Sequence, residues 1–214
     1  MHTWIDTLLV TVVLLNFFVL GSSRLAACIR CVALQGILLG MFTFLAHEAG
    51  SLLRPGLLAI ASISIKGIAF PVLLFRAMRE AEVRREIEPY VGYSLSILIG
   101  LAVLLLALWV SGRLPLPLEP VSSLVVPVAL FTSFVGLFVL ISRKKAITQV
   151  LGYLMLENGI YTFGVGLVQG TPMLIELGVL LDVFVAVFVM GITIFHINRQ
   201  FDHIDTDRLA LLKG

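Results

Sequence analysis

Charged residues are scarce in this sequence, and so are residues that could hold a metal ion or a redox centre. Only 13% of its 214 residues are charged, whereas 59% are hydrophobic. The two cysteines, Cys28 and Cys31, form a C-x-x-C pair without the nearby His or Cys ligands that complete a tetrahedral metal site. Haem and iron–sulfur ligand patterns, a phosphate-binding loop and a basic–aromatic nucleic-acid patch are also missing. The composition argues against a soluble enzyme and against nucleic-acid binding, and we expect no cofactor in this chain.

Long apolar stretches account for most of the chain. A helix needs about 20 apolar residues to cross the roughly 30 Å hydrocarbon core of a bilayer, and seven such stretches follow one another here. Pro89, Pro120 and Pro172 precede the fourth, fifth and seventh stretches, where proline is tolerated in a first helical turn. We therefore predict an all-α polytopic membrane helix bundle with spans at about 3–21, 25–47, 56–78, 90–111, 121–141, 147–168 and 173–196.

Basic residues alternate between the predicted connections. Of the 15 Lys and Arg residues, 12 fall at one set of helix ends, only Arg54 and Arg113 fall at the other, and Lys66 lies inside a span. The positive-inside rule then places the N-terminus outside and the C-terminus in the cytoplasm. One alternation satisfies every connection, which favours an odd number of spans.

The first three spans resemble the last three. Phe18–Leu20, a basic turn and Gln35–Ile37 recur as Phe138–Leu140, a basic turn and Asn158–Ile160. The two units are four spans apart, so they share one orientation. We predict two three-helix repeats joined by one extra helix: a first repeat over 1–79, a cytoplasmic helix extension and linking span over 80–120, and a second repeat with a cytoplasmic tail over 121–214.

Three charged residues fall near the middle of predicted spans: Lys66, Glu157 and Asp182. A charge at the bilayer centre costs about 2.5–3.5 kcal/mol on insertion scales, so such residues usually face a bundle interior or an aqueous cavity and pair with one another. Two pairs of opposite sign can form among these three. The pattern is typical of a proton or ion pathway; the alternative is a static ion pair that fixes two helices together.

Lys66 is followed by residues that weaken the helix around it. Pro71 has no N–H to donate to the carbonyl of Gly67, which lies one residue beyond the lysine. A carbonyl released next to a charge is a candidate water site within the membrane.

The sixth span carries the largest group of polar residues. Four of them recur every fourth residue and so form one stripe along a helix face, with Asn158 beside it: Gln149, Tyr153, Glu157 and Tyr161. The stripe is interpreted as a hydrated polar track in which Glu157 accepts a proton, or as polar groups that bond to neighbouring helices. Glycines at seven-residue spacing allow close approach of another backbone on the opposite face: Gly152, Gly159 and Gly166.

The seventh span adds two acids, Glu176 and Asp182. Six residues separate them by about 9 Å along a helix axis and about 120° around it, so they need not share a partner. Glu176 lies about one turn inside the outer face, whereas Asp182 is deeper.

Several of these segments resemble hydrogenase-4 component E. The similarity is carried by Gln149–Gly159, by Glu176-Leu-Gly with Asp182 after it, by the final residues Ile204–Gly214, and by Ser62–Glu80 around Lys66. The resemblance extends over the whole chain in length and span order.

The last three spans are also similar to the K subunit of respiratory complex I, which carries one glutamate in each of its second and third spans. The family pattern G-x-E-x-x-x-N is matched at its ends by Gly152 and Asn158, but Leu154 stands at the glutamate's position. Glu157 lies three residues further on and on nearly the same face. Asp182 is the best match to the third-span glutamate.

These resemblances imply a membrane subunit of a complex I-related energy-converting hydrogenase, of the formate hydrogenlyase type, in a bacterial or archaeal plasma membrane. Nickel–iron and iron–sulfur centres are then expected in partner subunits. The implied partners are antiporter-like membrane subunits, the membrane-anchor subunit and, indirectly, the peripheral hydrogenase arm.

Within such a complex the chain would take part in proton or cation translocation coupled to redox chemistry elsewhere. We expect proton transfer by Glu157, Asp182, Lys66 and Glu176, supported by Tyr153, Asn158 and Gln149. Two alternatives stay open: a structural scaffold without a proton path, and an independent ion transporter or antiporter component.

Overall fold

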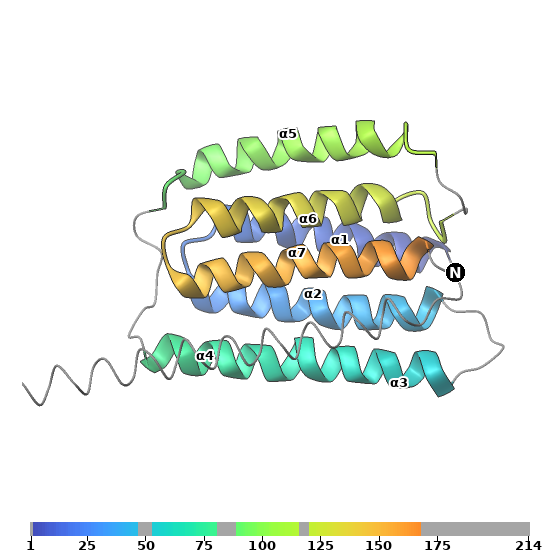
Figure 1. The fold of residues 1–214 in the computed structure, drawn as a ribbon, viewed down its shortest axis with the longest axis horizontal. Coiled ribbons are helices and arrows are strands. Elements are labelled where there is room, and N and C mark those ends of the chain that lie inside the picture. Colours follow the sequence, from blue (N-terminus) through green and yellow to red (C-terminus); the bar gives the residue numbers. More distant parts are fainter. Residues whose placement is uncertain (1, 47–52, 81–88, 116–119, 168–214) are drawn as a thin grey trace, which may run out of the picture.

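The computed structural model describes residues 2–46, 53–80, 89–115 and 120–167, and within these ranges every regular element is a helix. The helices run back and forth as one bundle (Figure 1). The predicted all-α fold is thus confirmed for the described part of the chain. The elements are α1 (His2–Gly21), α2 (Leu25–Ala46), a continuous helix made of α3 (Leu53–Ser62), η1 (Ile63–Ala69) and α4 (Phe70–Glu80), then α5 (Tyr93–Ser111), α6 (Val125–Ser142) and α7 (Ala146–Leu167).

Among the described residues, five helical segments are long and apolar enough to cross a membrane. They correspond to the first five predicted spans: Thr3–Gly21, Leu25–Ala46, Ala59–Arg79, Tyr93–Ser111 and Val125–Ser142. Helix α7 coincides with the sixth predicted span and has 22 residues, but it carries Glu157 and Asn158 and is not among these five. The seventh predicted span, 173–196, lies outside the described residues, so the total of seven stays a prediction.

The two fully described turns, between α1 and α2 and between α6 and α7, lie at the same end of the bundle (Figure 1). At this end the side chain of Arg143 donates a hydrogen bond to the carbonyl of Leu20 at 3.0 Å. The backbone N–H of Tyr90 donates to the carbonyl of Ser142, also at 3.0 Å. These contacts join the last turn of α1, the segment before α5 and the α6–α7 turn. Arg24 and Arg143, two basic residues of the turns, therefore lie at one end of the bundle, while the full alternation, the orientation across the membrane and the two-repeat arrangement stay predictions.

Glycines on α7 let it pack closely against α6. An added Cβ on Gly152 would meet the backbone of Leu140, and one on Gly159 would meet that of Ser133. The same crowding occurs on the α6 side at Gly136, which faces the backbone of Leu156. The predicted close approach at the seven-residue glycine spacing is confirmed, because only residues without a Cβ fit where two backbones touch.

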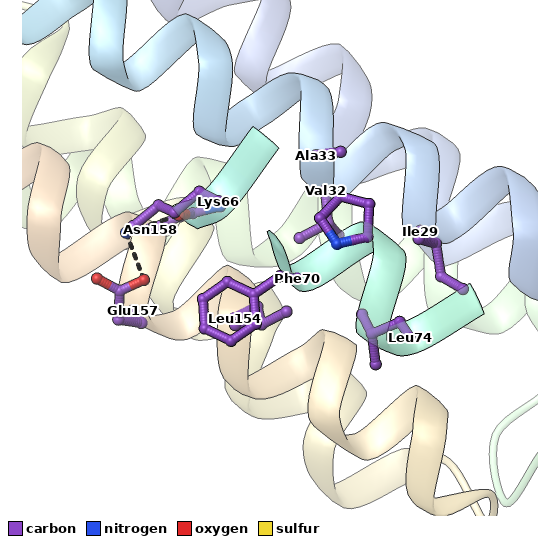
Figure 2. Close-up of a pocket in the computed structure, with 10 residues that line it drawn as sticks. Ile29, Val32, Ala33, Lys66, Phe70, Leu74, Leu154, Glu157 and Asn158 are labelled. Carbon is purple, nitrogen blue, oxygen red and sulfur yellow. Dashed lines mark hydrogen bonds and ion pairs between the residues drawn. The ribbon is translucent and has the colours of Figure 1, made fainter. Parts of the chain in front are cut away.

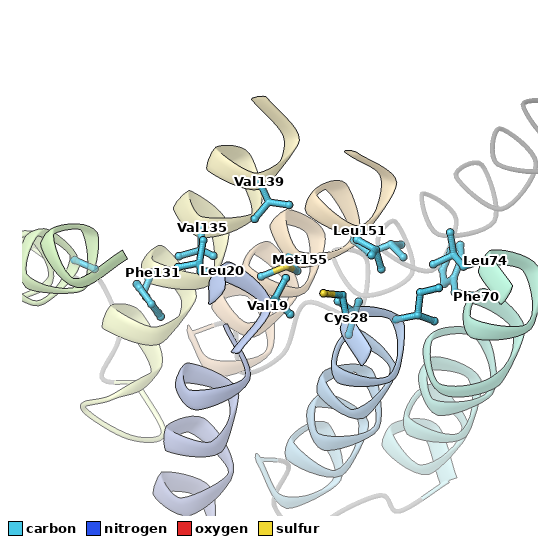
Figure 3. Packing of buried hydrophobic residues seen from close by; sticks show 14 residues of the cluster. Val19, Leu20, Cys28, Phe70, Leu74, Phe131, Val135, Val139, Leu151 and Met155 are labelled. Carbon is cyan, nitrogen blue, oxygen red and sulfur yellow. The ribbon is translucent and has the colours of Figure 1, made fainter. Parts of the chain in front are cut away.

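A hydrophobic cluster fills the space between α1, α2, α4, α6 and α7 (Figure 3). Cys28 is buried within it and packs as a small apolar residue. Several members of this cluster lie near the α1–α2 and α6–α7 turns, among them Leu20, Cys28 and Val139. Its labelled members in Figure 3 are Val19, Leu20, Cys28, Phe70, Leu74, Phe131, Val135, Val139, Leu151 and Met155.

Candidate functional site

Lys66 lies halfway along the α3–η1–α4 helix, inside its one stretch of π-helix. In this stretch the N–H of Phe70 bonds to the carbonyl of Ile65, five residues back. In that register the carbonyl left without a partner by Pro71 is that of Lys66, not that of Gly67 as α-helical spacing predicted. The proline thus explains a local change of helix type at the charged residue, a feature that is frequent at functional sites.

Lys66 pairs with Glu157 of α7 (Figure 2). Its ammonium nitrogen donates to Oε2 of Glu157 and, at 3.1 Å, to Oδ1 of Asn158. Lys66, Glu157 and Asn158 are only 5%, 4% and 2% exposed. Two of the three predicted mid-span charges are therefore brought together, and the buried ammonium is neutralised by a carboxylate and bonded to an amide oxygen.

An aromatic ring covers the same ammonium from the next turn of α7. The nitrogen of Lys66 lies 4.5 Å from the ring centroid of Tyr161, within the range of a cation–π contact. The hydroxyl of Tyr161 is 2.7 Å from that of Thr43 on α2, and Thr43 donates to the carbonyl of Leu39 at 2.9 Å. Because the single hydroxyl proton of Thr43 goes to Leu39, Tyr161 is the donor in its contact with Thr43. The cation–π contact and the Tyr161–Thr43 hydrogen bond thus connect the ion pair to α2 on the side of the bundle away from Arg143.

A cavity adjoins the ion pair on its other side (Figure 2). The polar groups of Lys66, Glu157 and Asn158 form one end of its lining. The remaining lining is apolar and comes from α2, α4 and α7. It consists of Ile29, Val32, Ala33, Phe70, Pro71, Leu74 and Leu154.

The polar stripe predicted on the sixth span does not stay together as one track. Gln149 is half-buried and donates to the carbonyl of Arg143 at 3.0 Å, at the end of the bundle. Tyr153 is half-buried and packs against the hydrophobic cluster. Only Glu157 and Tyr161, with Asn158, lie at the site. The stripe drifts around the helix because four residues make slightly more than one turn.

Asp182 and Glu176, the other two predicted proton-transfer residues, lie outside the described residues. Their roles stay predictions.

Sequence reasoning missed residues that shape the site from α2. Gly36 lies against Lys66 so closely that an added Cβ would overlap the lysine Cβ. Gly40 faces Ile63 in the same way one turn further on. The G-x-x-x-G spacing within an apolar span was the available signal, because small residues four apart mark close helix contacts in membranes.

The sequence has relatives among known proteins. Over 203 residues it is 33% identical to the uncharacterized protein Rv0085 of Mycobacterium tuberculosis, with 94% of this chain and 92% of that protein covered. Over 149 residues it is 27% identical to hydrogenase-4 component E of Escherichia coli K12 and of Shigella flexneri, with 70% of this chain and 69% of each relative covered. No family model and no solved structure matches the chain. The chain therefore belongs to the same protein family as Rv0085, and the hydrogenase-4 component E proteins are its more distant relatives.

Proposed function

We propose that this chain is a membrane subunit of a complex I-related, energy-converting hydrogenase complex, in which it takes part in proton or cation translocation. The observation that carries the proposal is the Lys66–Glu157 pair, because it is buried at the middle of two apolar helices. Ionisable residues at this depth are costly and are retained where charge must move or be sensed. The relationship to hydrogenase-4 component E supports a place in a hydrogenase complex.

Glu157 acts as the proton acceptor and Lys66 as its counter-charge. When Glu157 is ionised, the pair is neutral overall and the carboxylate accepts a bond from the ammonium. When Glu157 takes up a proton, Lys66 keeps the oxygen of Asn158 and the ring of Tyr161 as partners. Both states therefore leave Lys66 with defined contacts. A change of charge in a neighbouring subunit shifts the balance between these states.

Two features adjoin the pair on opposite sides. The hydroxyls of Tyr161 and Thr43 lead away from Glu157 in one direction. The cavity lined by Ile29, Phe70 and Leu74 leads in the other, and water entering it would reach the carboxylate. Asp182 and Glu176 are further candidates for proton transfer, while Gln149 and Tyr153 lie on α7 between Glu157 and the α6–α7 turn.

Redox chemistry takes place in other subunits. Nickel–iron and iron–sulfur centres belong to a peripheral hydrogenase arm, and antiporter-like and membrane-anchor subunits are the direct neighbours of this chain. The apolar outer faces, with Leu98, Leu105 and Ile141 more than half exposed, suit lipid and neighbouring membrane subunits.

The decisive test is hydrogen- or formate-driven proton uptake in vesicles that carry Glu157→Gln in the intact complex. The amide retains shape and an acceptor oxygen for Lys66 but cannot take up a proton. We expect redox turnover and assembly to persist while proton movement is lost. Ser96→Ala on α5 is the matched control, because it removes a buried hydroxyl that bonds to the carbonyls of Gly92 and Val91 just before its own helix and joins no second helix.

The interhelical bonds also favour a second function, that of a scaffold. Lys66–Glu157 joins η1 to α7, and Tyr161–Thr43 joins α7 to α2. A scaffold predicts that Glu157→Gln leaves proton uptake per turnover unchanged, and that Lys66→Met combined with Glu157→Leu still assembles and pumps. Proton transfer predicts loss of uptake in both.

A further inference from the structure

A second buried polar group lies on the far side of α2. Asn16 of α1, Gln35 of α2 and Thr132 of α6 are all 0% exposed. The amide nitrogen of Gln35 donates to Oδ1 of Asn16 at 2.7 Å, and that of Asn16 donates to the hydroxyl of Thr132 at 2.8 Å. We refer to these three side chains as the amide chain. It runs across three helices.

The amide chain lies at the same depth as the ion pair. Gly36, the residue after Gln35, is in contact with Lys66, and Gly159, the residue after Asn158, is in contact with Ser133 beside Thr132. Contacts between backbones place these residues at one level of the bundle. Polar side chains from α6, α1, α2, η1 and α7 thus form a single layer, which is surrounded by apolar residues above and below.

Two polar atoms in or next to this layer, Oε1 of Gln35 and the hydroxyl oxygen of Ser62, are buried and have no hydrogen-bond partner among the described residues. Ser62 lies one turn before Lys66, whereas the third such atom, the hydroxyl oxygen of Ser142, lies at the end of α6 and away from this layer. An unsatisfied carbonyl inside a membrane protein costs free energy, and bulk water cannot reach it through lipid. Such atoms are commonly satisfied by a buried water held between two or more polar groups.

We propose that a buried water binds at Oε1 of Gln35 and links the amide chain to the Lys66–Glu157 pair. The water donates to Oε1 on the α2 side. Its remaining bonds go to the polar groups of the same layer, with Ser62 and Glu157 as the candidate partners. With this water, a lateral polar connection crosses the bundle in addition to the Tyr161–Thr43 contact on the other side of the pair.

This connection can sense the charge of the ion pair. In the structure Gln35 donates to Asn16 and Asn16 donates to Thr132, which leaves the acceptor Oε1 of Gln35 at the α2 end of the amide chain. If both amides turn over, Thr132 donates to Asn16, Asn16 donates to Gln35, and an NH2 group faces the water instead. Both directions satisfy every internal bond, so the charge next to the water selects between them. This sensing role rests on the proposed proton-transfer function, whereas the water site does not.

The water site is tested by NMR on the full chain in lipid nanodiscs, with nitrogen-15 in the glutamine side chains. Through-space magnetisation transfer from water is measured at the amide protons of Gln35, and Gln35→Leu identifies their signal. Gln149, which is half-buried at the end of the bundle, is the internal control for contact with water. We expect transfer at Gln35 despite its complete burial.

The proposal is overturned if Gln35 receives no transfer while Gln149 does. Should Gln35→Leu not fold, the signal is assigned in the wild-type chain by through-bond correlation, so the result does not depend on the variant. Ser62→Ala should weaken the transfer at Gln35 if its hydroxyl holds the same water. Transfer at Gln35 together with normal proton uptake in Glu157→Gln would leave the water site standing and remove only the proposed proton-transfer function.

Discussion

Removing one charge of the buried pair should destabilise the bundle far more than removing both. In Lys66→Met the side chain keeps its length, but Glu157, 4% exposed, loses its ammonium partner and Asn158 loses its donor. Breaking a buried ion pair from one side typically costs about 3–5 kcal/mol. Since each 1.4 kcal/mol is about a factor of ten, the folding equilibrium should shift by roughly two to three and a half powers of ten.

The double variant Lys66→Met/Glu157→Leu removes the charge imbalance as well as the pair. Apolar replacement of both partners of a buried pair is often neutral or stabilising, by about 1–4 kcal/mol. The double variant should therefore be much more stable than Lys66→Met alone. Glu157→Gln is the control that keeps an acceptor for Lys66 and leaves the ammonium without its counter-charge, and it should fall between the two.

The assay is reversible unfolding of the purified chain in bicelles, with the same lipid and protein concentration for all variants. The free energy of unfolding is compared in a double-mutant cycle, which isolates the coupling between the two positions. Equal destabilisation by the single and double variants would refute the reasoning, because it would mean that packing volume rather than charge pairing governs this part of the bundle.

Two further predictions concern packing and hydrogen bonding around the site. Gly36→Ala should lower the melting temperature and the yield of folded protein, because its Cβ would overlap that of Lys66. The control is Gly164→Ala, whose Cβ would meet nothing within 4 Å, and it should leave both quantities unchanged or raise them. Equal losses in thermal melts would contradict the close contact of α2 and η1. Thr43→Val and Tyr161→Phe should each destabilise the bundle in bicelle unfolding, because the two hydroxyls share one buried hydrogen bond. A double-mutant cycle should give a coupling energy of about 0.6–1.7 kcal/mol between the two positions. Strictly additive effects would show that the two hydroxyls do not interact.

The polar layer explains why so apolar a chain retains charges at its centre. Lys66 has a carboxylate, an amide oxygen and an aromatic ring as partners, and these come from a single helix. A single neighbouring helix can therefore neutralise and orient the ammonium. The cavity next to the pair gives it a region that is less tightly packed than the rest of the bundle.

Hydropathy and charge spacing in the sequence determined which segments are helices and at what depth their charges lie. Long apolar runs form helices in lipid, because a helix satisfies all its backbone hydrogen-bonding groups internally. The basic residues marked the alternating ends, and Lys66 and Glu157 stood out because a mid-span charge is expensive. The glycine spacing in α7 likewise predicted a close helix contact, although it did not identify α6 as the partner.

Tertiary structure alone decided which residues meet. Lys66 pairs with Glu157 because η1, α2 and α7 are neighbours in the bundle. The spacing of residues within one helix does not reveal which helices are neighbours. The splitting of the sixth-span stripe depends on the drift of a four-residue spacing around the helix and on which neighbour each turn faces. The amide chain of Asn16, Gln35 and Thr132 depends on three helices meeting at one level. A sequence fixes positions along each helix axis, whereas pairing across helices is set by how side chains and glycine contacts fill the space between them.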